Sequence, residues 1–278
     1  MTRRTWIVLL LSIGGIVLLL FITIGVVAAV SLAGLAAGGY DEEILQGEGG
    51  AKIALIRIDG QIHGGGSEPG LFGGGGAGAQ DVIGQIRQAM DDDAVSGVIL
   101  RVDSPGGAVV ASDEIARAVR RLRERKPVVA SMGDLAASGG YYIASQAQRV
   151  FANPGTVTGS IGVIAILPNL EGTASKLGIR PVVMTAGDLK DVGSPFREMR
   201  PQERDLYQRL LDEAHTQFIE AVARGRGDEV ASIRRLADGR PYSGLQAEDN
   251  GLVDDLGDLE DAYDAVLELA ELRREEAS

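Results

Sequence analysis

Cysteine is absent from all 278 residues, and histidine occurs only twice. The lack of cysteine excludes disulfide bonds, thiol catalysis and Cys-ligated zinc, and two histidines argue against a His-rich metal site. The net charge is −12, and Lys and Arg form few clusters, which argues against a nucleic-acid partner. We therefore expect neither a metal site nor nucleic-acid binding.

Charged residues are also absent from residues 5–40, a stretch that begins directly after Arg3 and Arg4. Residues 6–30 alone make 25 residues, which at about 1.5 Å per residue in a helix exceed a hydrocarbon core of roughly 30 Å. The two arginines predict that the N-terminus stays in the cytoplasm and that the chain after Asp41 lies outside. The sequence therefore predicts a single-pass anchor in the cell membrane.

A cleaved signal peptide is the alternative, because Ala33, Ala36 and Ala37 offer small-residue cleavage sites. The apolar run is longer than the h-region of about 7–15 residues that such peptides carry, so we favour an uncleaved anchor in contact with membrane lipid. The predicted organisation is a cytoplasmic N-terminus and anchor at 1–40, a polar linker at 41–51 and an extracytoplasmic domain at 52–278.

Short apolar runs rich in β-branched residues alternate with amphipathic stretches from residue 52 onward. The runs predict extended segments at 52–58, 97–102, 128–132, 149–152, 156–167 and 180–185. The amphipathic stretches predict helices at 81–90, from the turn after Gly107 to 125, and at 141–147, 170–177, 202–224 and 259–274. This alternation favours an α/β core of parallel strands joined by right-handed crossovers, with a helical C-terminal extension. The glycine-rich stretch at 64–78 predicts a loop that buries little surface.

Ser138 lies where one predicted strand gives way to a helix, within the sequence GDLAASGGYYIAS. A hydroxyl at that corner faces the positive end of the helix dipole, and Gly139 and Gly140 allow another backbone to come close. A nucleophile would suit that position. Serine is also among the commonest helix N-caps, so capping is the alternative on these residues alone.

The predicted strand at 97–102 is followed by the sequence DSPGG, which ends at Gly106 and Gly107. Such a turn can present backbone N–H groups toward a cavity, as an oxyanion hole requires. Pro-Gly is also an ordinary turn signal, so the turn by itself does not identify a site.

A serine nucleophile needs a base, and the two histidines fit that role poorly. His63 borders the glycine-rich stretch, and His215 lies on a polar-looking face in the middle of a predicted helix, so we expect both to be solvated. A Ser–Lys dyad is the other possibility, and the chain has only four lysines. Three of them, Lys52, Lys126 and Lys176, have surroundings typical of solvated charges.

Lys190 differs from these three because it lies in a loop that leaves the end of a predicted strand, where α/β proteins gather their sites. Arginine cannot give up its proton, so a lysine in a chain rich in arginine suits a base. To act near neutral pH, such a lysine needs a pKa lowered from about 10.4 toward 7–8, which requires burial away from water. A surface ion pair with Asp188 or Asp191 is the alternative.

Five segments together resemble the signal peptide peptidase A family in its short, single-domain form. They are LRVDSPGG at 100–107, LAASGGYYIAS at 135–145, GTVTGSIGV at 155–163, GDLKDVGSPFREM at 187–199 and DGRPYSGLQAEDNGLVDDLG at 238–257. They occur in the family's order and cover most of the chain from residue 52 onward. The resemblance implies an α/β fold of superhelical ββα units, similar to the Clp-protease/crotonase superfamily.

The same resemblance implies roles for individual residues. It implies a serine protease without a cofactor, in which Ser138 is the nucleophile and Lys190 the general base. Ser160 would hydrogen-bond the lysine amine and orient it. Backbone N–H groups near Gly106 and Gly107 would form the oxyanion hole.

Members of this family assemble as ring- or dome-like homo-oligomers, in which short forms draw the lysine from a neighbouring subunit. By this resemblance the isolated protomer would lack a complete site, and its substrates would be extended apolar peptides outside the cytoplasm, such as remnant signal peptides. The alternatives are a protease of the same superfamily that acts on a specific membrane protein, a crotonase-like acyl-CoA enzyme, and a non-catalytic oligomeric scaffold. An outward-facing domain disfavours the acyl-CoA enzyme, since acyl-CoA is cytoplasmic.

Overall fold

The computed structural model describes residues 40, 50–66 and 76–277. The predicted anchor, except for Tyr40, lies outside the described residues, as do most of the predicted linker and the middle of the glycine-rich stretch. No helix in the described part is both long and apolar enough to cross a membrane.

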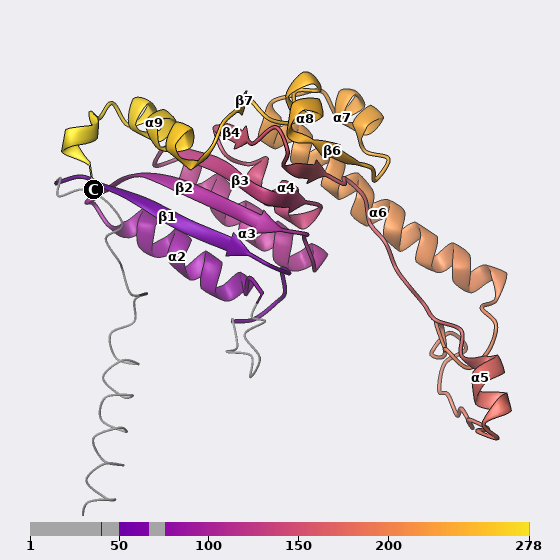
Figure 1. Cartoon of the computed structure of the whole chain (residues 1–278). Helices are drawn as coiled ribbons and strands as arrows, with labels where there is room; N and C mark the ends of the chain where they lie inside the picture. Colours follow the sequence, from indigo (N-terminus) through magenta and orange to yellow (C-terminus); the bar gives the residue numbers. More distant parts are fainter. Residues whose placement is uncertain (1–39, 41–49, 67–75, 278) are drawn as a thin grey trace, which may run out of the picture. The chain divides into compact units, whose positions relative to one another are not determined.

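A sheet of seven described strands forms the centre of the fold (Figure 1). Its strands are β1 (Lys52–Asp59), β2 (Val95–Ser104), β3 (Val128–Ala137), β4 (Arg149–Ala152), β5 (Val157–Gly159), β6 (Pro241–Ser243) and β7 (Asp255–Leu256). The strands β1, β2, β3, β4 and β7 follow one another in parallel. The short β5 pairs in parallel with the last residues of β3, and β6 runs antiparallel to β5. The predicted parallel α/β core is confirmed.

Helices cover both faces of this sheet, so its central strands bury apolar side chains on both sides. One face packs against α2 (Ala79–Asp91), α3 (Val109–Arg123) and α4 (Gly139–Ala144), and the other against α9 (Leu259–Leu269) (Figure 1). Successive side chains of a strand point to opposite faces. Leu100 of β2 therefore joins the core with Ile115 of α3, whereas Ile99 packs in the second cluster with Val266 of α9.

A long helix connects this core with the segment around residues 164–200. The remaining helices are α5 (Glu171–Lys176), α6 (Pro201–Arg226), α7 (Val230–Leu236), α8 (Gly244–Asp249) and the 3-10 turn η1 (Arg274–Glu276). Apolar side chains of α6 enter the core only in its C-terminal half, where Phe218, Ile219 and Val222 are buried. The ring centre of Phe218 lies 4.9 Å from that of Tyr142 in α4, so this half of α6 packs directly on α4.

The strand predicted at 180–185 is wrong. These residues form neither strand nor helix, and Val182 and Met184 are 85% and 92% exposed. An extended segment needs a neighbouring strand to bond its N–H and C=O groups, and no described strand runs beside this one. The predicted extended segment at 156–167 likewise contributes only β5, and the last predicted helix ends at Leu269 rather than at residue 274.

Candidate active site

Ser138 occupies the single residue between the end of β3 and the start of α4, as predicted. Its backbone has φ 52° and ψ −120°, a conformation that costs a non-glycine residue on the order of 1–3 kcal/mol. Its N–H donates to the carbonyl of Gly159 at 2.9 Å, which ties the corner to the end of β5. The Ser138 side chain makes no capping hydrogen bond to α4, so the capping alternative is wrong and the hydroxyl is free for chemistry.

The loop after β2 presses against this corner. Gly106 has φ 91°, and a Cβ atom there would lie 2.8 Å from the Cβ of Ser138 and 2.5 Å from the nitrogen of Gly139. A Cβ atom on Gly139 would in turn collide with Oγ of Ser112 and lie 3.3 Å from the nitrogen of Gly107. Only glycine therefore fits on both sides of the contact. Because neither residue has a Cβ atom, the loop backbone can lie alongside Ser138.

Hydrogen bonds fix the orientation of the loop's peptide groups. The N–H of Gly106 donates to Oγ of Ser104 at 3.0 Å, and that hydroxyl donates to the carbonyl of Gly60 at 2.6 Å. The carbonyl of Gly106 accepts from the N–H of Ile62 at 2.9 Å. Since C=O and N–H of a trans peptide point in opposite directions, the N–H of Gly107 points away from Ile62.

Two backbone N–H groups are left for an oxyanion. Neither Gly107 nor Gly139 has a partner for its N–H among the residues that the structure describes, and both line a pocket with Ser138. Gly139 is the first residue of α4, where helical N–H groups have no partner within the helix. Of the glycines expected from the sequence, Gly107 is thus available, whereas the N–H of Gly106 is already bonded to Ser104.

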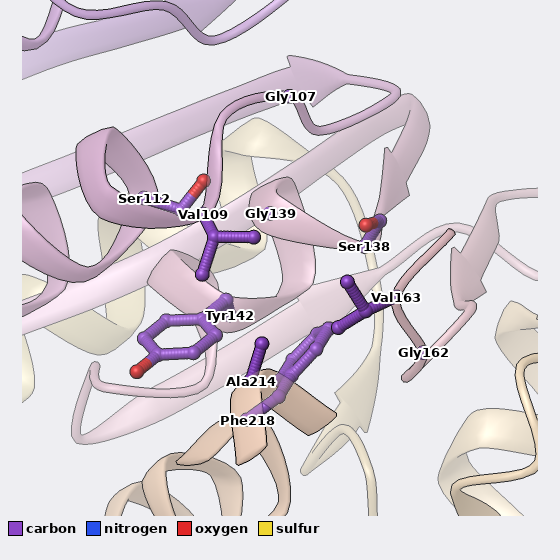
Figure 2. Close-up of a pocket in the computed structure, with 10 residues that line it drawn as sticks. All are labelled: Gly107, Val109, Ser112, Ser138, Gly139, Tyr142, Gly162, Val163, Ala214 and Phe218. Atoms are coloured by element: carbon purple, nitrogen blue, oxygen red, sulfur yellow. The ribbon is translucent and has the colours of Figure 1, made fainter. Parts of the chain in front are cut away.

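The pocket beside Ser138 is mostly apolar (Figure 2). It holds about 290 Å³ of space, part of it open to solvent, and is lined by Gly107, Val109, Ser112, Ser138, Gly139, Tyr142, Gly162, Val163, Ala214 and Phe218. The Tyr142 hydroxyl points away from Ser138 and donates to Oδ1 of Asp113 at 2.9 Å. Burial, with a smaller contribution from Asp113, raises the pKa of Tyr142 to about 12. The phenol therefore stays neutral, and its ring forms an uncharged part of the pocket lining.

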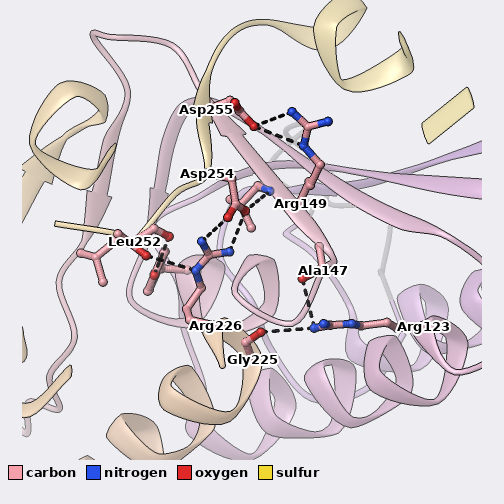
Figure 3. A network of polar contacts seen from close by, with 11 residues as sticks. Arg123, Ala147, Arg149, Gly225, Arg226, Leu252, Asp254 and Asp255 are labelled. Carbon is pink, nitrogen blue, oxygen red and sulfur yellow. Dashed lines mark hydrogen bonds and ion pairs between the residues drawn. The ribbon is translucent and has the colours of Figure 1, made fainter. Parts of the chain in front are cut away.

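Ion pairs and carbonyl contacts hold α6 in position as the wall that supplies Ala214 and Phe218 (Figure 3). Arg226, at its C-terminal end, donates from Nη1 to Oδ2 of Asp254 at 2.8 Å. Arg123 of α3 donates to the carbonyl of Gly225 at 3.2 Å and also to the last carbonyls after α4. The pocket is therefore built from elements that are rigidly joined.

Ser160 lies close to the corner, because it follows the residue whose carbonyl binds the N–H of Ser138. Its backbone has φ 50°, and its own N–H donates to the carbonyl of Arg240 at 3.0 Å. Its hydroxyl donates to the carbonyl of Gly239 at 3.4 Å, the long end of the hydrogen-bond range. This weak contact leaves Ser160 able to accept a better partner.

Lys190 is not brought to Ser138 within one chain. It is exposed and does not line the pocket. The next residue, Asp191, is joined through Arg197 to Glu203 in the first turn of α6. Ala214, which lines the pocket, lies about 16 Å further along the same helix, at 1.5 Å per residue. The structure thus assembles Ser138 and the two free N–H groups, and leaves the expected base apart from them.

The other titratable candidates lie outside the pocket as well. His63 makes a 3.1 Å contact with the carbonyl of Gly64. Nε2 of His215 is buried and has no hydrogen-bond partner in the described part of the chain. The expectation that His215 is solvated is therefore wrong for that atom. Two of the lysines expected to be solvated are bonded: Lys52 to Asp92, and Lys126 to carbonyls at the end of α2. No described group of three His, Cys, Asp or Glu side chains could hold a metal ion.

The chain is similar in sequence to known peptidases. The profile of peptidase family S49 matches residues 120–273. An Enterococcus faecium protein named for signal peptide peptidase SppA is 37% identical over 227 residues, 81% of this chain and 66% of that protein. A Methanocaldococcus jannaschii protein named as a protease is 36% identical over 263 residues, 94% of this chain and 84% of its relative. Protease 4 of Haemophilus influenzae is 36% identical over 228 residues, but this chain spans only 36% of its length.

Proposed function

The chain belongs to peptidase family S49 and is a serine protease, and from that premise we propose that Ser138 is its nucleophile and Lys190 its general base. We propose further that it is a membrane-anchored endopeptidase that cleaves extended apolar peptides, such as remnant signal peptides, outside the cytoplasm. The observation that carries this assignment is the strained corner at Ser138, whose hydroxyl does not cap α4 and which lies beside two N–H groups without partners among the described residues.

The proposed reaction uses few groups. The neutral amine of Lys190, oriented by Ser160, takes the proton of Ser138 as Oγ attacks a peptide carbonyl. The carbonyl oxygen becomes negative and accepts hydrogen bonds from the N–H groups of Gly107 and Gly139. The protonated lysine passes its proton to the leaving amine, and an ester to Ser138 is left. Lys190 then takes a proton from the water that hydrolyses this ester.

In this proposal Lys190 comes from a second copy of the chain. The separation along α6 argues against a dyad within one protomer. Ile164, Val182 and Met184, in the segment that carries Lys190, are 78%, 85% and 92% exposed. Apolar side chains exposed to this extent mark an interaction surface. Their burial in a homo-oligomer would remove them from water and would also shield the lysine amine, as a neutral base requires.

The pocket supports an apolar substrate. Val109, Val163 and Phe218 line it. Among the described residues of its lining, the polar side chains are Ser112, Ser138 and Tyr142, whose hydroxyl is bonded to Asp113. An extended peptide that adds to a strand edge presents alternate side chains to such a pocket. An N-terminal anchor would keep the enzyme where cleaved signal peptides accumulate.

Two variants and a covalent probe test the proposal on the full-length protein in detergent or lipid. We expect Ser138→Ala and Lys190→Ala each to abolish cleavage of an apolar peptide while the variants fold and assemble. A fluorophosphonate probe followed by mass spectrometry should label Ser138 in the wild type. Turnover that survives in either variant, or labelling of a different serine, would refute the dyad.

A further inference from the structure

The loop that carries Lys190 is tied to α6 by one arginine whose hydrogen bonds are all used. Arg197 has five N–H donors, and each has an acceptor: Oδ2 and the carbonyl of Asp191 (both 2.7 Å), the carbonyl of Glu198 (3.0 Å), and Oε2 and Oε1 of Glu203 (2.9 and 2.8 Å). The side chain of Arg197 thus joins the residue after Lys190 to the first turn of α6.

The helix end of this connection is buried. Glu203 is 0% exposed, and its carboxylate also accepts from the backbone N–H of Arg200 at 3.1 Å and from Nε of Arg200 at 2.8 Å. Hydrogen bonds from Arg197, more than any other contact, lower the pKa of Glu203 to about 2, so the carboxylate is ionised throughout the working range of pH. A buried, fully bonded carboxylate is a fixed point from which a loop can be held.

The loop end of the connection consists of short turns centred on Asp191. The N–H of Lys190 donates to the carbonyl of Gly187 at 3.1 Å, and the N–H of Ser194 donates to the carbonyl of Asp191 at 3.2 Å. Val192 makes a similar bond to Leu189 at 3.3 Å. These local bonds set the curvature of the loop but do not attach it to a helix. A backbone bond from the N–H of Leu170 to the carbonyl of Pro195 holds the far end of the loop beside α5, at 2.6 Å. Arg197 bonds the loop to α6, at the residue adjacent to Lys190.

We propose that Arg197 is a positioning residue for catalysis: clamped by Glu203, it holds Asp191 and thereby aims the side chain of Lys190. This inference rests on the proposed role of Lys190 as the general base. A base presented from the exposed segment of one subunit to the serine of another needs such an attachment, because a displacement of about 1 Å at a reacting group can cost about 100-fold in rate. Lysine cannot replace Arg197, since one ammonium cannot bond Asp191 and Glu203 together in the same geometry.

The experiment compares Arg197→Lys and Arg197→Gln with the wild type in the assembled full-length enzyme. We expect kcat to fall at neutral pH by about 10- to 100-fold, with little change in KM, because the substrate pocket is untouched. A lysine that is held less well in its shielded position gives up its proton only at higher pH. The acidic limb of the pH–rate profile should therefore move upward by about one unit, and part of the lost rate should return above pH 9.

Arg149→Gln is the matched control. Arg149 also bridges two carboxylates, Asp255 (Figure 3) and Glu268, with a side chain 34% exposed against 28% for Arg197. It belongs to β4 and makes neither ion pair with the loop that carries Lys190. We expect Arg149→Gln to lower the melting temperature without moving the pH–rate profile. Asp191→Asn is the milder second variant, which leaves the Arg197–Glu203 pair intact and should move the profile in the same direction.

Wild-type kcat and an unshifted profile in assembled Arg197→Gln and Arg197→Lys would overturn the inference. So would a fall in rate of the same size at every pH, which would mean that Arg197 acts only on folding or assembly. Lys190→Ala separates the two proposals: if that variant is inactive while the Arg197 variants behave as wild type, the dyad stands and the positioning role fails. Turnover by Lys190→Ala would instead refute the dyad itself.

Discussion

Replacing Ser104 by alanine should damage turnover through the oxyanion loop, although this side chain touches no substrate. The serine is completely buried, and its hydroxyl accepts from the N–H of Gly106 and donates to the carbonyl of Gly60. The substitution removes both bonds. Gly60 is exposed, so water can replace the hydroxyl there, whereas Gly106 is buried and its N–H loses its only partner in the described part of the chain.

The size of the effect follows from that single orphaned donor. A buried N–H without a partner costs about 1–3 kcal/mol, and the loop can recover this energy by rotating the peptide at Gly106 toward another acceptor. The peptides on either side of Gly106 share its Cα atom, so this rotation would shift the N–H of Gly107 away from the oxyanion and strain the hydrogen bond from Ile62 to the carbonyl of Gly106. If the free energy of the original loop orientation rises by about 1–3 kcal/mol relative to the rotated one, fewer molecules aim the N–H of Gly107 at the oxyanion. Their fraction, and hence kcat, should fall by a factor of about 5 to 150. KM should change much less.

Ser145→Ala provides the control. Ser145 is also completely buried, donates to the carbonyl of Tyr142 at 2.9 Å and accepts from Nε2 of Gln146 at 2.8 Å, so the same number of bonds is lost. The melting temperature should fall by a similar amount in both variants. Only Ser104→Ala should also have a lower kcat, and its affinity for a peptide aldehyde should fall by the same factor as kcat. Wild-type kcat and aldehyde affinity in Ser104→Ala, measured beside a destabilised Ser145→Ala, would refute this account of the loop.

Three further outcomes are expected. Gly107→Ala should reduce kcat by about 100-fold or more. The added Cβ atom collides with the carbonyl of Ile62, so the N–H of residue 107 must move away from the oxyanion. Peptide-cleavage rates measured beside a thermal melt would separate this loss of activity from unfolding. The pKa of Glu203 is lowered to about 2, so its carboxylate stabilises the folded state fully above its ordinary pKa of 4.5 and progressively less as the pH falls toward 2. Acid titration followed by circular dichroism should therefore show a loss of stability across that interval that is smaller in Glu203→Gln. Met184→Asp should shift the proposed homo-oligomer toward monomer in analytical ultracentrifugation, and activity should fall as assembly falls. An unchanged sedimentation profile would argue against this surface as an interface.

The elements that the sequence predicts correctly are those whose partners lie within the same chain. The runs at 52–58, 97–102 and 128–132 become β1, β2 and β3, because apolar, β-branched residues are buried on both faces of a parallel sheet. The corner at Ser138 is also predictable, since a strand, a serine and two glycines leave few other conformations. The run at 180–185 has the same composition as a strand, yet no strand pairs with it among the residues that the structure describes.

Sequence reasoning missed parts of the site that depend on side-chain hydrogen bonds. The bond from the N–H of Gly106 to Ser104 joins residues only two apart, and a serine before Pro-Gly-Gly could have suggested it, whereas the bond from Ser104 to the carbonyl of Gly60 spans 44 residues and could not be foreseen. Gly139 could have been proposed as the second donor, since the first N–H groups of a helix have no partner within it. The proposed role of Arg197 could not have been foreseen, because the two carboxylates that it bonds lie six residues away on either side.

A mixing experiment tests whether the two halves of the proposed site come from different chains. Ser138→Ala and Lys190→Ala should each be inactive alone, since each lacks one half of every site. If the site is shared, subunits exchanged at random in equal amounts should give active sites wherever the intact serine of one variant meets the intact lysine of the other, about one quarter of all sites. A site within one chain would give no recovery, because every chain in the mixture carries a defect. Failure to regain activity after co-assembly, verified by differently sized tags, would therefore place serine and lysine in the same protomer. The loop bonded to Glu203 would then have to approach Ala214, which lies about 16 Å further along α6.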